Sequence, residues 1–286
     1  MTHDTTQAFF ASSDGTLIYA EAVGNKHLPG IVFLHGLALT SLVWDKLLHD
    51  PRLLELFYMV AYDMRGHGRS GKPETPEGHA SKLYADDFAA VCKGFGLKSP
   101  IFNGWSLGGA VLADITSHLN PNAISGAILS NPMPYLDPAV VTAVAKPEIL
   151  DLIPGLSTTD DVALAFESRF KFIDTLFINP ERVPVQTKWA WMASAALPKP
   201  QTFGLMISRP QDPTGLFKAG KDGLPLLLFT SGKDRHLRAE AEQEIARTHF
   251  TDLTVLHIEE GSHTLFYDFN DKYVGEIIEF GKRVFG

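Results

Sequence analysis

Short apolar runs of strand length, alternating with helix-like segments, constrain the fold of this 286-residue chain most strongly. The runs at 31–34, 57–61 and 224–229 are continuously apolar, so both of their faces are predicted to be buried. Buried strands between helices are typical of a mostly parallel sheet covered on both sides. Further strands are predicted at 16–20, 100–103, 123–130 and 253–258, with an opening hairpin at the Asp14-Gly15 turn. The pattern predicts an α/β fold with an eight-stranded, mostly parallel sheet.

The alternation stops between residues 131 and 215, where helical patterns occur without a convincing strand. This segment holds 11 of the 18 prolines, only 3 of the 24 glycines, and many aromatic residues. A composition shift of this size predicts an inserted helical subdomain at 131–215. The core would then consist of residues 1–130 and 216–286.

Composition and charge exclude several classes of protein. The chain is 45% hydrophobic, which is enough for a large core, and its formal charge of −8 without a basic run disfavours nucleic-acid binding. Cys92 is the single cysteine and is expected in the core, so the chain has neither an intrachain disulfide nor a cysteine-rich zinc site. The N-terminus has no signal-like apolar run, and no apolar stretch approaches membrane-spanning length. We expect a cytoplasmic protein without membrane or nucleic-acid partners.

The sequence Gly104-Trp105-Ser106-Leu107-Gly108 forms a G-x-S-x-G motif between the predicted strand 100–103 and a predicted helix at 107–119. A strand–turn–helix with this motif presents a serine hydroxyl on a sharp turn, and glycine fits positions where a side chain would collide with that turn. We therefore predict Ser106 as a nucleophile. The alternative is a glycine-rich helix start with an ordinary N-cap serine.

A serine nucleophile needs a base and a group that orients the base. Asp234 follows the strand 224–229, and His263 lies in a loop between the strand 253–258 and the last helix, near 271–285. This chain order of nucleophile, acid and histidine predicts Asp234 and His263 as the partners of Ser106. The alternatives are a turn aspartate and an ordinary loop histidine. His236, two residues after Asp234, is interpreted as a loop residue.

Acyl transfer also requires two N–H donors for the oxyanion. The amide of Leu107 follows the nucleophile and supplies one. The loop after the strand 31–34 supplies the other, for which Leu37 is predicted, with Gly36 or Ala38 as alternatives. His35 is interpreted as a structural residue of this loop.

Together these motifs resemble the α/β-hydrolase superfamily. The resemblance includes His35-Gly36, the Asp63–Ser70 loop with D-x-R-G-x-G-x-S spacing, and Gly261-Ser262-His263. It implies that 131–215 is the family's cap and that the Asp63–Ser70 loop is architectural, with Arg65 in an ion pair. Members that are haloalkane dehalogenases or epoxide hydrolases carry an aspartate at the nucleophile position. Ser106 instead resembles the serine of carboxylesterases.

The resemblance implies a serine hydrolase that cleaves carboxylic esters of small to medium apolar substrates and needs no metal or organic cofactor. Lactone opening, C–C bond hydrolysis with the same triad, and a hydrolase-fold small-molecule receptor are the alternatives. Aromatic and apolar residues beside the nucleophile and in the cap are the predicted substrate-binding residues: Trp105, Phe170, Phe172, Phe177, Trp189, Trp191, Met192 and Met206.

Overall fold

The computed structural model describes residues 4–286 and confirms the predicted eight-stranded α/β fold. The strands lie in the order β1-β2-β4-β3-β5-β6-β7-β8. The pairs β1–β2 and β2–β4 are antiparallel, and every other neighbouring pair is parallel. The strands are β1 (Thr6–Ala11), β2 (Leu17–Val23), β3 (Gly30–Leu34), β4 (Tyr58–Tyr62), β5 (Ile101–Trp105), β6 (Gly126–Ser130), β7 (Leu226–Ser231) and β8 (Leu253–Ile258).

The five central parallel strands are buried along their whole length, which explains their continuously apolar sequences. The edge strands differ from them: β1 alternates between exposed and half-buried residues, and β8 is mostly half-buried. The predicted opening hairpin is confirmed as the β1–β2 pair.

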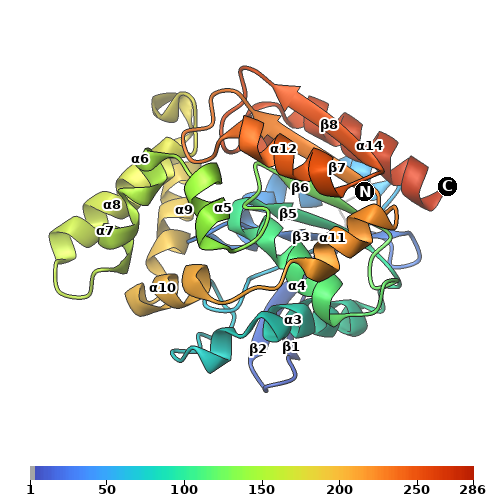
Figure 1. The fold of residues 1–286 in the computed structure, drawn as a ribbon, viewed down its shortest axis with the longest axis horizontal. Helices are drawn as coiled ribbons and strands as arrows, with labels where there is room; N and C mark the ends of the chain where they lie inside the picture. Colours follow the sequence, from blue (N-terminus) through green and yellow to red (C-terminus); the bar gives the residue numbers. More distant parts are fainter. Residues whose placement is uncertain (1–3) are drawn as a thin grey trace.

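Helices cover both faces of the sheet. Figure 1 shows α3 (Ser81–Phe95), α4 (Val111–His118), α11 (Thr214–Lys221) and α12 (Ala239–His249) on the face toward the viewer. The last helix, α14 (Asn270–Phe285), lies behind the sheet and contacts the short α2 (Pro51–Leu54). Within residues 4–286 we find no helix with both the length and the apolar character needed to cross a membrane.

The remaining short helices join these elements. They are η1 (Ser41–Trp44), α1 (Asp45–Leu48), η2 (Glu77–His79), η3 (Ser106–Ala110) and α13 (Leu265–Asp268).

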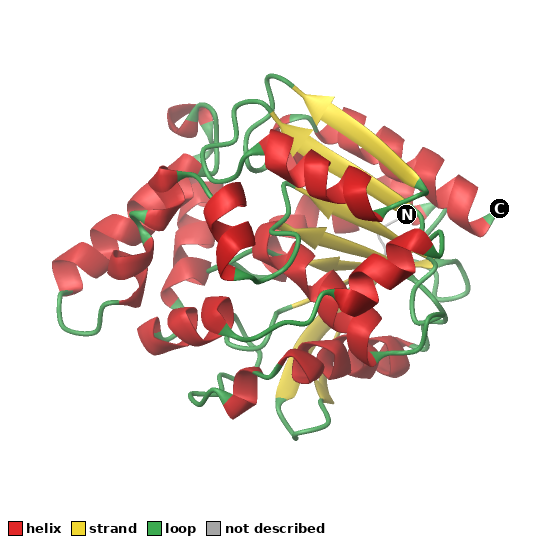
Figure 2. Cartoon of the chain, viewed as in Figure 1, coloured by secondary structure: helices red, strands yellow, loops and turns green. Residues whose placement is uncertain are grey.

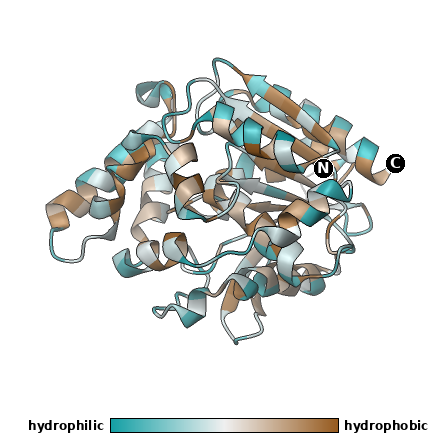
Figure 3. Ribbon diagram, in the orientation of Figure 1, coloured by the Kyte–Doolittle hydropathy of each residue, from teal (hydrophilic) through white to brown (hydrophobic). Residues whose placement is uncertain are grey.

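The chain between β6 and β7 folds into helices, as its sequence predicts. Figure 2 shows these helices beyond the arrowheads of the parallel strands, and Figure 3 shows brown, apolar stretches along them. They therefore lie at the carboxyl ends of the strands. Before α11 they are α5 (Pro138–Val144), α6 (Pro147–Leu150), α7 (Ile153–Ser157), α8 (Val162–Thr175), η4 (Pro180–Arg182), α9 (Val185–Ala196) and α10 (Pro200–Ser208).

A buried ion pair joins this helical segment to the core. The Arg209 guanidinium, just after α10, donates to both carboxylate oxygens of Asp114 in α4 at 2.8 and 2.6 Å. Gln211 donates to the same carboxylate at 2.8 Å and to the Ala110 carbonyl at 2.8 Å. Both charged groups are almost fully buried. The segment is thus fixed to the helix that follows Ser106.

The Asp63–Ser70 loop is braced by two buried carboxylates. Arg65 pairs with Asp87 through two hydrogen bonds of 2.7 and 2.6 Å, which confirms its predicted ion pair. The Asp63 carboxylate accepts from the amides of Ser41 and Arg69 at 2.8 Å each. The loop after β4 is therefore held to the loop after β3.

Replacing Arg209 by alanine would leave the Asp114 carboxylate buried without its charge partner. Breaking a buried pair in this way costs about 3–5 kcal/mol. We expect Arg209→Ala to lower the free energy of unfolding by that amount in urea titrations. The exposed Lys218–Asp222 pair offers a control, because Lys218→Ala should cost no more than about 1 kcal/mol. Equal losses in the two variants would contradict a special role for the buried pair.

Candidate active site

Ser106 occupies a strained turn between β5 and η3. Its φ angle is +54°, in the left-handed region that residues with a Cβ rarely adopt. A Cβ at Gly108 would lie 2.5 Å from the His35 carbonyl oxygen, and one at Gly104 would lie 2.8 Å from the Gly108 carbonyl oxygen. Both glycines are therefore required by backbone atoms, as predicted from the motif.

The loop after β3 packs directly on this turn. A Cβ at Gly36 would lie 2.9 Å from the Ser106 Cβ, so only a glycine permits this approach. The Ala38 amide donates to His67 Nε2 at 3.0 Å and is not free for a ligand. Leu37 lines the same cavity as Ser106 and Leu107, and within residues 4–286 its amide has no acceptor. The Leu107 amide lies in the first turn of η3, where N–H groups lack helical partners.

Asp234 and His263 are joined by a hydrogen bond. The Nδ1–H of His263 donates to Asp234 Oδ2 at 2.7 Å, and both side chains are buried. The other carboxylate oxygen accepts from the amides of His236 and Leu237 at 2.6 and 3.0 Å. Burial alone would raise the pKa of Asp234, but the charge and hydrogen bond of His263 and the His236 amide lower that pKa below its ordinary value. Asp234 is therefore an anionic acceptor.

Trp105, the residue before Ser106, fixes the position of the His263 loop. The indole Nε1 of Trp105 donates to the His263 carbonyl at 2.8 Å, and the two ring centroids are 5.3 Å apart. The side-chain Nδ2 of Asn131 also donates to this carbonyl and to that of Ser262, at 3.0 Å each. In the described part of the chain, no hydrogen bond joins the Ser106 hydroxyl to His263. In enzymes without substrate such contacts are often long, and they tighten when substrate binds.

Ser106 opens into an apolar cavity of about 130 Å³. Among the described residues, its only polar lining side chains are those of Ser106 and His236. The remaining lining residues come from the chain just after β3, β5 and β7 and from the helical segment: Leu37, Leu107, Met133, Leu136, Val141, Ala145, Ile149, Leu150, Ile153, Phe172, Ile207 and Leu237.

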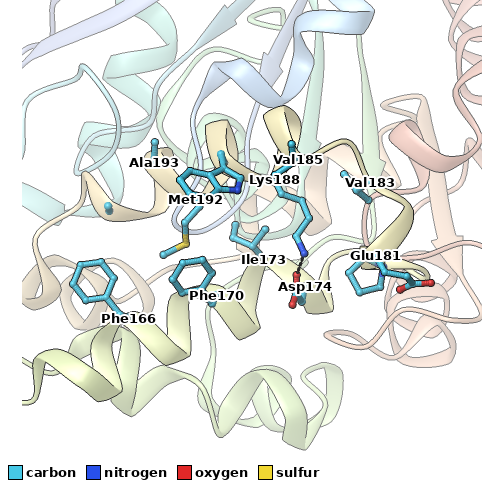
Figure 4. A pocket seen from close by; sticks show the side chains of 13 residues that line it. Phe166, Phe170, Ile173, Asp174, Glu181, Val183, Val185, Lys188, Met192 and Ala193 are labelled. Carbon is cyan, nitrogen blue, oxygen red and sulfur yellow. Dashed lines mark ion pairs between the residues drawn. The ribbon is translucent and has the colours of Figure 1, made fainter.

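Phe172 is the one predicted substrate-binding residue that lines this cavity in the described part of the chain. Phe170, Trp189 and Met192 line a separate groove of about 480 Å³ between α8 and α9, where Figure 4 shows Phe170 and Met192 near the ion pair of Asp174 and Lys188. Phe170 is 56% exposed and Trp189 72% exposed. Phe170 and Trp189 therefore lie on the outer surface of the helical segment and not in the Ser106 cavity.

Trp105, Phe177 and Trp191 are buried in aromatic packing, and Met206 is buried as well. Phe177 stacks on Trp191 with ring centroids 5.1 Å apart. Trp105 packs against Phe266 and Trp44. Trp105 therefore orients the His263 loop and does not line the cavity.

His236 lies in a loop, as interpreted from the sequence, but the sequence did not show that it lines the Ser106 cavity. Its ring centroid is 4.5 Å from that of His263, its Nε2 is 2.7 Å from the Thr175 hydroxyl, and only 2% of the residue is exposed. Its position two residues after Asp234 was the available signal, because the carboxylate that holds His263 also binds the His236 amide.

His35 has the structural role predicted for it. Its Nε2 accepts from the Met64 amide at 3.0 Å and its Nδ1 is 2.8 Å from the Gly36 carbonyl oxygen, so it joins the loops after β3 and β4. Across residues 4–286, no group of three or more His, Cys, Asp or Glu side chains is arranged to hold a metal ion.

Comparisons with known proteins identify the family of the chain. A family model described as the alpha/beta hydrolase family matches residues 31–276. A non-heme chloroperoxidase of Streptomyces lividans is 33% identical over 146 residues, which cover 49% of each chain. A bifunctional esterase/perhydrolase of Acinetobacter calcoaceticus is 33% identical over 140 residues, again 49% of each chain. The chain thus spans about half the length of the curated relatives it matches.

Solved structures resemble the chain over nearly its whole length. A Burkholderia cenocepacia protein assigned as an aryl esterase superposes with a TM-score of 0.86 at 26% identity, covering 98% of this chain and 99% of that one. An esterase from Rhodococcus sp. ECU1013 superposes with a TM-score of 0.87 at 23% identity, covering 97% and 99% of the two chains. The second likeness shows the fold alone.

The close packing at Gly108 predicts a large effect of one methyl group. In Gly108→Ala the new Cβ would meet the His35 and Leu34 carbonyl oxygens at 2.5 and 2.7 Å, and backbone atoms cannot rotate away. We expect a loss of about 1–3 kcal/mol in the free energy of unfolding, measured in urea. Gly275→Ala, in an open position on α14, is the control and should be neutral or stabilising by up to about 1 kcal/mol. A neutral Gly108→Ala variant would refute the steric argument.

Buried histidines predict that the protein loses stability in mild acid. Burial lowers the pKa values of His35, His67, His79 and His236, so these rings stay neutral in the fold but take protons in the unfolded chain below a pH of about 6.5. The free energy of unfolding should therefore fall from pH 7 to pH 5, by up to about 1.4 kcal/mol per pH unit for each histidine.

His67→Gln tests this linkage because the glutamine oxygen can still accept from the Ala38 amide without titrating. The slope of the unfolding free energy against pH should decrease by up to about 1.4 kcal/mol per pH unit, which is the contribution of one proton. An unchanged slope would show that His67 is not protonated on unfolding in this range.

Proposed function

Since this chain belongs to the alpha/beta hydrolase family, we propose that it is a serine hydrolase that cleaves carboxylic esters of small to medium apolar substrates. The observation that carries the proposal is the Asp234–His263 hydrogen bond next to a strained Ser106 that opens into an apolar cavity. The esterase/perhydrolase of Acinetobacter calcoaceticus and the aryl esterase assignment in Burkholderia cenocepacia support ester chemistry.

In the proposed first step, Ser106 Oγ attacks the ester carbonyl carbon. Because Nδ1 of His263 carries the proton that is donated to Asp234, Nε2 is the free acceptor that takes the proton from the serine. The imidazole becomes positively charged, and the buried Asp234 carboxylate stabilises that charge. The amide N–H groups of Leu37 and Leu107 hold the oxyanion that forms on the carbonyl oxygen.

The tetrahedral intermediate then collapses. His263 returns its proton to the leaving alcohol, and the acyl group remains on Ser106 as an ester. Water attacks this acyl-enzyme with His263 again as the base, which releases the carboxylic acid and restores the serine hydroxyl. No step of this sequence requires a metal or an organic cofactor.

Substrate size in this proposal follows from the cavity. A space of about 130 Å³ between apolar side chains accommodates a short aliphatic or small aromatic group. Met133, Leu136 and Phe172 come from the segment 131–215, which therefore acts as the cap over a core of 1–130 and 216–286.

Ser106→Ala should abolish esterase activity while leaving the fold intact. Removing the nucleophile of a triad costs about four to six orders of magnitude in kcat. The rate of p-nitrophenyl butyrate hydrolysis measures this loss, and urea titration checks the fold. Ser125→Ala is a matched control that should retain normal rates, because the Ser125 hydroxyl donates to the Ser99 carbonyl.

The same assay separates the candidate activities. Multiple turnover of short-chain aryl esters supports the esterase assignment. Near-normal turnover by Ser106→Ala would overturn the nucleophile assignment. Hydrolysis of lactones but not of open-chain esters would indicate a lactone hydrolase instead of an esterase. Binding of a ligand without turnover would indicate a receptor.

A further inference from the structure

His236 places a hydrogen-bonding group in a cavity that is otherwise apolar apart from the nucleophile. Its side chain lines the Ser106 cavity, yet the mechanism above uses it only through its backbone amide. The ring packs against Phe172 and His263, with centroid distances of 5.3 and 4.5 Å. These contacts and the Thr175 hydrogen bond fix the orientation of the almost fully buried ring.

The proton on this ring can be located from its neighbours. The Thr175 hydroxyl lies 2.8 Å from the Phe172 carbonyl oxygen, which needs a donor because the Leu176 amide bonds to Ile173 and Asp174 instead. If Thr175 donates to Phe172, its oxygen must accept from His236 Nε2–H at 2.7 Å. The opposite arrangement would leave the Phe172 carbonyl without this donor. The satisfied network therefore places the proton on Nε2.

The other ring nitrogen is then an unprotonated acceptor. Among residues 4–286 the His236 ring hydrogen-bonds through Nε2 to Thr175, and no hydrogen bond to its Nδ1 occurs. Burial, with the neighbouring His263 ring, lowers the pKa of His236 well below its ordinary value, which keeps the ring neutral. An acceptor without a partner in an apolar cavity favours a ligand that brings a donor.

We propose that His236 Nδ1 is a specificity determinant that accepts a hydrogen bond from a hydroxyl or amide N–H on the substrate. This inference rests on the proposed ester hydrolysis at Ser106 and narrows its substrate class to esters that carry such a donor near the carbonyl. The apolar lining residues bind the hydrocarbon part of the substrate, and His236 binds its one hydrogen-bond donor.

A panel of matched esters tests the assignment. Aryl butanoates with no substituent, a hydroxyl or a methoxy group at C2 or C3 probe the acyl side, and phenyl acetates with the same groups on the ring probe the alcohol side. On at least one side, the wild-type enzyme should favour the hydroxyl compound over both others by roughly three- to tenfold in kcat/KM. A methoxy group only accepts, so it separates a donor requirement from a size effect.

Variants at His236 complete the test, with the hydroxyl-to-unsubstituted ratio of kcat/KM as the readout. Because both substrates use the same triad, changes in the triad cancel in this ratio. His236→Phe should reduce it to about 1, whereas His236→Asn, which retains an acceptor near the Nδ1 position, should keep part of the preference.

Three results would overturn the inference while leaving ester hydrolysis established. They are the absence of any hydroxyl preference on either side, an equal preference for methoxy, and a preference that persists in His236→Phe. Absence of turnover for every ester would instead refute the proposed function itself.

Discussion

The close approach of two loops at Ser106 is the constraint on which the rest of the site depends. Gly36 and Gly108 let the loop after β3 and the turn after β5 pack at distances that any Cβ would prevent. This contact places Leu37 and Leu107 at the cavity into which Ser106 opens. The positive φ of Ser106 is maintained because closely packed neighbouring backbone prevents the turn from relaxing to another conformation. Strain at the serine and close packing of the glycines are therefore one feature.

A network of buried polar groups orients the remaining parts of the site. Asp234 binds His263 through one oxygen and two backbone amides through the other. Asn131, at the end of β6, has a φ angle of +40° and holds the carbonyls of the loop that contains His263. Loops after three neighbouring strands are thus tied together, and this explains how residues far apart in sequence keep a fixed geometry.

The sheet was predictable because burial on both faces leaves a continuous apolar run in the sequence. The turn at Ser106 was predictable because its glycines are required by backbone sterics. The short helix α2 was not predicted, although Asp50 caps it and Pro51 begins it, since four residues carry too little periodicity to be recognised.

The set of residues that line the Ser106 cavity was not predictable for a different reason. Phe170 and Phe172 lie on the same helix two positions apart, and the 3.6-residue turn directs one to the outer groove and the other to the Ser106 cavity. An aromatic residue count does not show which face of a helix meets the core. His236 was missed because its role depends on contacts with Thr175 and Phe172, which are about sixty residues away.

The neighbouring positions of β6 and β7 have a consequence for how proteins of this shape diversify. The two strands pair directly, Ala127 beside Leu226, so the helical segment leaves and re-enters the sheet at adjacent points. Neighbouring parallel strands lie only about 5 Å apart, so an inserted segment of almost any length can connect their ends without shifting the register of the sheet. Whole inserted segments are therefore exchangeable by recombination, with new ligand preferences acquired while the reaction machinery is inherited intact.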